Sequence, residues 1–135
     1  MNFHPVGRDP KTGEMFMKFH IPYTIVEKIQ LLQRWILVQS FSYYELNDTI
    51  TSDFQYDSNA KQLAELRNQY PDEFKRSKYY PYFHDYCSDV DGTVNTSGFD
   101  LLERLRKTDK DMYRRVWMDA VWALELKSKY QGVSV

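Results

Sequence analysis

Residues 42–71 read SYYELNDTITSDFQYDSNAKQLAELRNQYP, and they decide how the rest of the chain is interpreted. An aromatic pair, Tyr43 and Tyr44, closes one helical pattern, and a second begins after a short polar turn. Ser52 is a candidate N-cap, and Gln55 completes the S-x-x-Q pattern of a capping box. The stretch therefore predicts an antiparallel helical hairpin with a sharp turn.

The first turn of the second helix carries Asp53, Tyr56 and Asp57 at i, i+3 and i+4, which places them on neighbouring positions of one face. We expect the turn to bring Tyr43 and Tyr44 to the same corner and to form a small cleft with aromatic walls and acidic acceptors. Such a cleft can stabilise a planar cationic ring, and ribose hydroxyls can donate to its aspartates. The same residues also suit a plain helix start, where Asp53 stabilises by roughly 0.3–1 kcal/mol.

Composition predicts one domain spanning residues 1–135, with a formal net charge of -1 that requires neither nucleic acid nor an anionic membrane as the main partner. The single cysteine, Cys87, excludes an internal disulfide framework and suits a reducing compartment. The sequence contains no apolar run of membrane-spanning length and no apolar signal-peptide centre near its start. We therefore expect a cytoplasmic protein.

Apolar periodicity predicts a mainly α fold, in which a helical hairpin and further helices form one small domain. The first helix, expected at 24–45, has Thr24 and Glu27 as a capping box and two apolar stripes, so it should be central. The second should run over 53–70 and end at Pro71. Residues 1–22 are expected to form a short extended arm or hairpin, and residues 24–73 the helical hairpin.

Residues 74–135 combine an aromatic segment with C-terminal helices. Ser97 can cap a short helix over 98–106, and Thr108 a long one over 109–130. The aromatic residues 77–87, broken by Pro81, are predicted to be extended; they either pack on the helices or form an exposed stacking surface. Residues 89–92, with neighbouring Thr93, weakly resemble a calcium loop or a phosphatase motif, but a solvated turn is the better interpretation.

A run of basic residues has two interpretations, as a solvated helix face or as a binding site for phosphate or an acidic partner. The run consists of Arg104, Arg106, Lys107, Lys110, Arg114 and Arg115. Glu103, Asp109 and Asp111 interrupt it, which favours the solvated face. As a candidate partner-binding surface it nevertheless remains the strongest cationic feature of the sequence.

Catalytic motifs are missing from the sequence. It contains no zinc-ligand pattern, no phosphate-binding glycine loop and no Ser/His/Asp arrangement. His4, His20 and His84 have no recognisable partners. We therefore expect neither an enzyme nor a required cofactor.

The hairpin resembles the N-terminal domain, domain Ia, of bacterial NAD-dependent DNA ligases. The resemblance covers roughly residues 30–73 and rests on the pattern Y-Y-x-x-N-D-x-x-x-x-D-x-x-Y-D, followed by L-x-E-L-x-x-x-x-P. Tyr44 stands where the family more often has His, and Thr49 where it usually has Pro. The resemblance implies that five residues hold nicotinamide mononucleotide, the leaving half of NAD: Tyr43, Tyr44, Asp53, Tyr56 and Asp57.

The resemblance also implies what the chain lacks. Ligases form an adenylated lysine in a separate domain with a K-x-D-G motif, and Lys107-Thr108-Asp109-Lys110 has the wrong fourth residue. Short ligase-related proteins of this kind resemble those of bacteriophages and prophages. The sequence therefore predicts a non-catalytic binding protein that acts through a protein partner, such as a ligase, or by self-association. The alternative is a phage inhibitor of a host defence enzyme, for example an anti-CRISPR protein, that reuses the scaffold without a ligand.

Overall fold

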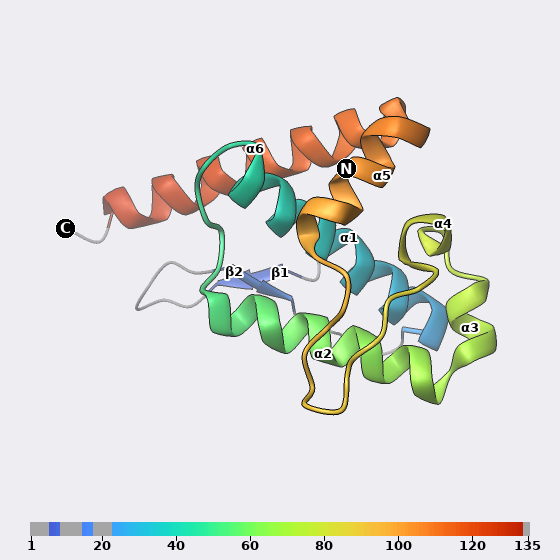
Figure 1. Ribbon diagram of the computed structural model, residues 1–135. Helices are drawn as coiled ribbons and strands as arrows, with labels where there is room; N and C mark the ends of the chain where they lie inside the picture. The colour runs from blue at the N-terminus through green and yellow to red at the C-terminus, as the bar shows by residue number, and fades with distance from the viewer. Residues whose placement is uncertain (1–5, 9–14, 18–22, 134–135) are drawn as a thin grey trace.

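A computed structural model describes residues 6–8, 15–17 and 23–133 and confirms a mainly helical fold (Figure 1). Two short strands, β1 Val6–Arg8 and β2 Met15–Met17, precede the helices. The helices formed by the described residues are α1 Ile25–Tyr44, α2 Asp53–Gln69, α3 Pro71–Lys75, α4 Tyr80–Phe83, α5 Gly98–Thr108 and α6 Lys110–Val133.

The central position of α1 is confirmed. It packs against α2, α3, α5 and α6, and every residue of 35–42 is buried. Thr24 caps it as predicted: Glu27 N donates to Thr24 Oγ1 at 3.1 Å, and Thr24 N donates to Glu27 Oε1 at 3.0 Å. Because α1 is apolar on more than one side, other helices can pack around it. Its last turn lies at the edge of the core, where Tyr43 and Tyr44 are exposed.

The hairpin of α1 and α2 is also confirmed, and the two helices lie against each other. α2 buries Ala60 and Leu63 and ends at Gln69. Pro71 follows as the first residue of α3, where its missing N–H costs no helical hydrogen bond.

The segment 77–87 is not extended, and that prediction was wrong. It contains the helical turn α4, with Pro81 near the start of the helix, where proline is tolerated. Its aromatic rings pack inward as the first of the two alternatives proposed: the buried ones are Tyr79, Tyr82, Phe83 and Tyr86.

The predicted cap of the last helix was also wrong. Thr108 is the last residue of α5, and its Oγ1 donates to the Arg104 carbonyl at 2.6 Å. Asp109 caps α6 instead, since Met112 N donates to Asp109 Oδ1 at 3.0 Å. The Ser97 cap of α5 is confirmed by the hydrogen bond from Asp100 N to Ser97 Oγ at 3.1 Å.

The N-terminal arm forms a hairpin where it is described. β1 and β2 pair antiparallel, with Val6 opposite Met17 and Arg8 opposite Met15. The rest of the predicted arm, residues 1–5, 9–14 and 18–22, lies outside the described residues. Among the described helices, none has both the length and the apolar character that crossing a membrane requires.

Candidate functional site

The C-terminal turn of α1 presents the tyrosine pair at the surface. Tyr43 is 54% exposed and Tyr44 48% exposed, and their rings meet edge to face with centroids 4.9 Å apart. On its other side Tyr44 contacts Phe99 of α5, again edge to face, at 5.8 Å. The two tyrosines are therefore exposed at the end of α1, and the ring of Phe99 supports Tyr44.

The turn between α1 and α2 is held by local hydrogen bonds. Asn47 adopts φ +55°, a left-handed conformation that asparagine tolerates better than most residues. Asp48 N donates to the Ser42 carbonyl at 3.0 Å, and Asp48 Oδ1 accepts from Thr49 N at 2.7 Å. Lys127 of α6 donates to the Thr49 carbonyl, so the turn is also tied to the last helix.

The start of α2 forms half of the predicted capping box. Gln55 N donates to Ser52 Oγ at 3.2 Å, as expected. The Gln55 side chain does not return to the Ser52 backbone; its Nε2 donates instead to Asn59 Oδ1 at 3.3 Å, because this buried side chain lies one turn ahead on the same face. Asp53, in the first turn, is exposed and favourably placed near the helix N-terminus.

Tyr56 joins α2 to α1. Its hydroxyl lies 3.1 Å from Ser40 Oγ, and it is the donor because Ser40 Oγ already donates to the Ile36 carbonyl at 2.7 Å. Burial raises the pKa of Tyr56, so the phenol stays neutral. The main chain of Gly98 in α5 approaches the same pair so closely that a Cβ there would lie 2.4 Å from Ser40 Oγ and 2.9 Å from the Tyr56 hydroxyl.

These elements enclose a cavity of about 240 Å³, which we call the tyrosine cleft. Four of the five predicted ligand-binding residues line it: Tyr43, Tyr44, Asp53 and Tyr56. Gln39, Ile50 and Thr51 also line it, and the hydrogen bond of 2.6 Å from Thr51 Oγ1 to Gln39 Oε1 fixes that part of the wall. Its volume is below the roughly 300–1,000 Å³ of pockets for drug-sized ligands, so the cleft suits a single ring better than a whole dinucleotide.

Asp57, the fifth predicted residue, does not line the tyrosine cleft. It lines a neighbouring cavity of about 290 Å³, which we call the second cavity. Tyr44 and Tyr56 line both cavities, so the two tyrosines separate them. Phe99, Ser40 and the loop that lines the second cavity were not predicted to lie at this corner, since nothing in their local sequence pattern shows that they approach it.

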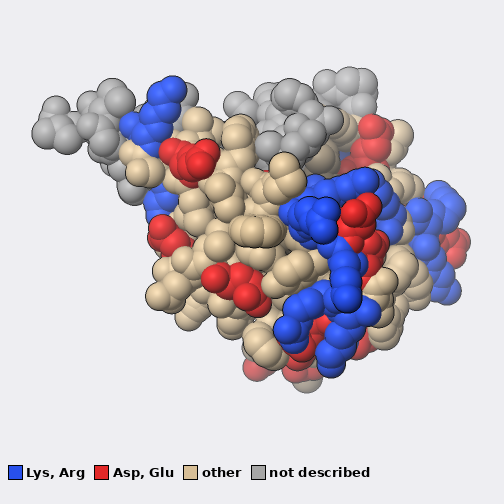
Figure 2. Space-filling view, turned by 90° about the horizontal axis from the view of Figure 1, so that it is seen from above, with Lys and Arg blue, Asp and Glu red and all other residues tan. Residues whose placement is uncertain are grey.

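The basic run is largely engaged with acidic neighbours. Arg104 holds Asp85 through two hydrogen bonds of 2.8 and 3.0 Å and donates to the Tyr82 carbonyl at 2.9 Å, so it stabilises the fold. Figure 2 shows Lys and Arg side chains gathered over α5 and the start of α6, with acidic side chains among them. The other pairs join Arg106 and Lys107 to Glu103, and Arg115 to Asp111. Partner binding by this run stays a prediction.

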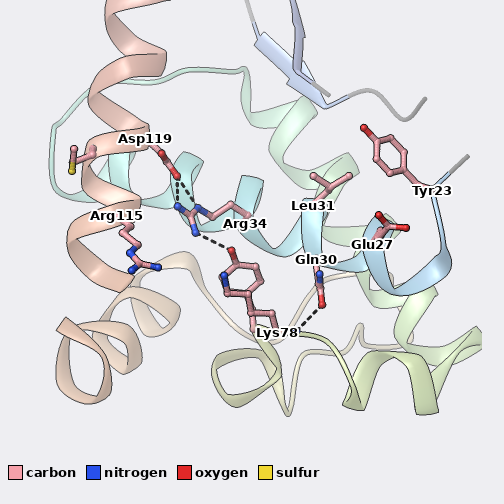
Figure 3. Close-up of a pocket in the computed structure, with 10 residues that line it drawn as sticks. Tyr23, Glu27, Gln30, Leu31, Arg34, Lys78, Arg115 and Asp119 are labelled. Carbon is pink, nitrogen blue, oxygen red and sulfur yellow. Dashed lines mark hydrogen bonds and ion pairs between the residues drawn. The ribbon is translucent and has the colours of Figure 1, made fainter. Parts of the chain in front are cut away.

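A third cavity, of about 600 Å³, was not anticipated from the sequence (Figure 3). Arg34 of α1 lies in its wall and donates to Asp119 of α6 and to the Tyr79 hydroxyl, at 2.7 and 2.8 Å. Lys78 and Arg115 also line this cavity. No group of three or more His, Cys, Asp or Glu side chains suitable for a metal ion occurs among the described residues.

Comparison with known proteins shows a partial, distant similarity to bacterial DNA ligases. The chain is 35% identical over 52 residues to the DNA ligases of Thermotoga petrophila, Thermotoga maritima and Thermotoga neapolitana. The match covers 38% of this chain but only 8% of each ligase. No protein-family model matches the chain, and no solved structure matches it. The similarity therefore relates one segment of the chain to a small part of a much longer enzyme.

Proposed function

We propose that this chain is a non-catalytic binding protein that holds the nicotinamide mononucleotide half of NAD, as the resemblance to ligase domain Ia implies. The observation that carries the proposal is the tyrosine cleft. Four residues line this one cavity beside the turn between α1 and α2, and their spacing is that of domain Ia: Tyr43, Tyr44, Asp53 and Tyr56. The similarity to bacterial DNA ligases over 52 residues supports the same relationship.

The chemistry of the cleft suits an oxidised nicotinamide ring, which is planar and positively charged. The exposed rings of Tyr43 and Tyr44 offer aromatic faces and edges to such a cation. Asp53 adds a carboxylate at the rim, and its exposure means that binding a ligand need not break an existing ion pair. The neutral Tyr56 hydroxyl keeps an acceptor position after donating to Ser40.

We further propose that the protein acts through a protein partner and that it is encoded by a bacteriophage. Domain Ia of the ligases closes over a ligand held by a neighbouring domain, so a partner would complete the binding surface. The alternative, an inhibitor of a host defence enzyme, is favoured by one observation: Trp117 and Met118 of α6 are 48% and 62% exposed. Exposed aromatic and methionine side chains are typical anchors of protein interfaces.

Calorimetric titration with nicotinamide mononucleotide tests ligand binding. Wild type should bind, and Asp53→Ala or Tyr43→Ala should each lower affinity about tenfold or more, since a lost hydrogen bond or ring contact to a charged ligand costs roughly 1.5–3 kcal/mol. Asp111→Ala is the matched control, because Asp111 is an exposed aspartate in the first turn of α6. Binding that is undetectable in all four proteins would contradict the proposal.

Incubation with labelled NAD tests the absence of catalysis. The Lys107–Lys110 segment lacks the final glycine of the K-x-D-G motif, and in the structure the Asp109 carboxylate accepts from Met112 N and from the Tyr82 hydroxyl. We expect no covalent adenylate after denaturation. A labelled protein band that persists, and that is lost in Lys107→Ala, would show that the chain carries a nucleophile.

A further inference from the structure

The third cavity is lined by three parts of the chain that lie far apart in the sequence. They are residues 23–34 around the start of α1, residues 78–79 between α3 and α4, and residues 115–119 of α6. None of the described residues that line it also lines the tyrosine cleft. Its volume of about 600 Å³ lies within the roughly 300–1,000 Å³ that is typical of pockets for small molecules. The third cavity is therefore large enough to hold a ligand of its own.

Hydrogen bonds to α1 fix the segment that carries Lys78. Gln30 Oε1 accepts from Lys78 N at 3.0 Å, and Nε2 of the buried Gln33 donates to Ser77 Oγ at 2.9 Å. The Lys78 ammonium lies 5.7 Å from the centroid of the Tyr79 ring, which also lines the cavity. The backbone of Lys78 is thus held at the cavity wall while its side chain stays exposed.

The third cavity has a cationic end. Figure 3 shows the basic side chains of Arg34, Lys78 and Arg115 on one side of the cavity. Tyr23 and Glu27 lie on the other side. Since Arg34 is compensated by its ion pair with a carboxylate of α6, the net positive charge at this end comes from Lys78 and Arg115.

Neither Lys78 nor Arg115 is strongly neutralised by the described part of the chain. Lys78 forms no ion pair with a described carboxylate. Arg115 Nη2 lies 3.7 Å from Asp111 Oδ2, but these side chains are 59% and 77% exposed, so the pair contributes little. The Tyr79 hydroxyl accepts from Arg34 Nη1 at 2.8 Å and keeps its own proton for donation. Two cations and a hydroxyl donor favour an anion with several acceptor oxygens.

A phosphate monoester fits these charges better than a carboxylate does. It carries a charge of about −1.5 to −2 at pH 7, which matches the two positive charges of Lys78 and Arg115. A guanidinium can also bind two phosphate oxygens at once. At the opposite end, Glu27 Oε1 accepts from Thr24 N at 3.0 Å, which leaves Oε2 to accept from a hydroxyl or amino group of a ligand.

We propose that the third cavity binds the phosphate monoester of a small polar molecule, such as a sugar or a nucleoside. Lys78 and Arg115 bind the phosphate, and the organic part extends past Leu31 towards Glu27. Arg34 is a positioning residue, because its hydrogen bond holds the Tyr79 hydroxyl at the cavity wall. The inference goes beyond the proposed function and does not depend on it, since the described residues of this site and of the tyrosine cleft are different.

Calorimetry with four probes tests the inference. Glucose 6-phosphate and adenosine monophosphate carry the same phosphate on different organic parts, glucose lacks the phosphate, and inorganic phosphate lacks the organic part. Wild type should bind both esters, and glucose 6-phosphate about tenfold or more tightly than glucose, the value of a charge-assisted hydrogen bond. Inorganic phosphate should bind about threefold or more weakly than the esters, because it makes no contact near Glu27.

Variants at the cationic end locate the effect. Lys78→Met and Arg115→Met should each lower the affinity for both esters about tenfold or more. Arg115→Lys should lose less than Arg115→Met, since it keeps the charge and loses only the planar fork. Lys110→Met is the matched control, because Lys110 is exposed at the start of α6 and does not line the cavity. All these side chains are exposed, so the melting temperature should change little.

Three results would overturn the inference. They are failure of both esters to bind, equal affinity for glucose and glucose 6-phosphate, and ester binding that is unchanged in Lys78→Met and Arg115→Met. Inorganic phosphate that binds as tightly as the esters would show a general anion site and overturn the assigned organic part.

The fate of this site can be distinguished from that of the proposed function. No probe carries a nicotinamide ring, so failure of the esters leaves the nicotinamide mononucleotide proposal standing. Asp53→Ala, which changes the tyrosine cleft, should bind both esters as wild type does. Loss of ester binding in Asp53→Ala would place the esters in the tyrosine cleft and contradict the inference.

Discussion

The guanidinium of Arg34 in α1 and the carboxylate of Asp119 in α6 form an ion pair that is almost withdrawn from solvent. Arg34 is 17% exposed and Asp119 is 1% exposed, and Arg34 Nε donates to Asp119 Oδ2 at 2.7 Å (Figure 3). The other oxygen, Oδ1, is buried and has no hydrogen-bond partner among the residues that the structure describes. The carboxylate therefore depends on Arg34 for its compensation.

Arg34→Met should destabilise the protein strongly, by about 3–5 kcal/mol, because it leaves a buried carboxylate unpaired. The double variant Arg34→Met/Asp119→Leu should recover most of this loss, since apolar side chains of similar size can replace a buried pair. Urea unfolding measures both. Arg115→Met, an exposed position in the same cavity, should change stability by less than about 0.5 kcal/mol. If the single and double variants were equally unstable, the loss would come from packing and not from the charge.

Gly98→Ala should destabilise by about 1–3 kcal/mol, the usual cost of adding a methyl group to a filled site. A Cβ at Gly98 would lie 2.8 Å from Ser40 Cβ as well as against Ser40 Oγ. At the first position of a helix the same change would otherwise be favourable. The double variant Ser40→Gly/Gly98→Ala should therefore be more stable than the sum of the two single changes predicts. If the losses of stability in the two single variants simply added up in the double variant, the added methyl group would not be in contact with Ser40.

Local sequence patterns were enough to predict the hairpin and its corner. Apolar periodicity and capping residues predicted α1 and α2, and the short turn between them predicted that Tyr43 and Asp53 meet. The errors arose where a nearby residue offered another hydrogen bond. Asp109, and not Thr108, caps α6. The Gln55 side chain, expected to bond the Ser52 backbone, donates to Asn59 instead.

Local sequence patterns could not predict contacts between residues that lie far apart in the sequence. Phe99 supports Tyr44, and Tyr86 faces the same corner from a loop that follows α4. Neither position has a periodic or capping signal that points to the hairpin. No local pattern links Arg34 to Asp119 either, since only the packing of α1 against α6 brings them together.

Acid should destabilise the protein through Asp85 and Asp109. The hydrogen bonds from Arg104 lower the pKa of Asp85, and those from Met112 N and the Tyr82 hydroxyl lower the pKa of Asp109. A carboxyl group whose pKa is lower in the folded protein stabilises it fully above the unfolded value of about 4, and this contribution is lost as the pH falls through the folded pKa. Burial raises the pKa of Asp119, so that residue acts in the opposite direction.

Thermal unfolding between about pH 5 and pH 2 measures this dependence. Asp109→Asn should flatten the fall in melting temperature, because asparagine can still cap α6 through its single amide oxygen and does not titrate. The acceptor for the Tyr82 hydroxyl is lost in this variant at every pH, so that loss does not change the slope. Asp111→Asn is the control and should follow wild type. Asp111 is exposed in the first turn of α6, and its ion pair with Arg115 is exposed as well. An Asp109→Asn curve with the wild-type slope would assign the acid loss to other groups.

The exposed face of α6 should mediate contact with a protein partner. Arg114, Trp117 and Met118 are exposed at i, i+3 and i+4, so they lie together on one face, and Arg115 is their neighbour. Arginine and tryptophan are the residues that most often anchor interfaces. Arg114→Glu/Arg115→Glu should therefore weaken partner binding tenfold or more while the fold stays intact.

A bacterial NAD-dependent DNA ligase lacking its own domain Ia is a partner on which this can be measured. Sedimentation with that ligase, with and without nicotinamide mononucleotide, should detect a complex with wild type and much less with the α6 variant. Lys75→Glu/Arg76→Glu, a matched charge reversal at exposed positions on and next to α3, should bind as wild type does. A complex that forms equally well with both variants would move the interface away from α6. Two results together would favour the inhibitor over the ligase-related role. Wild type would form no complex with the ligase, and it would capture a host defence enzyme that the α6 variant fails to capture. The same face would then bind a different partner.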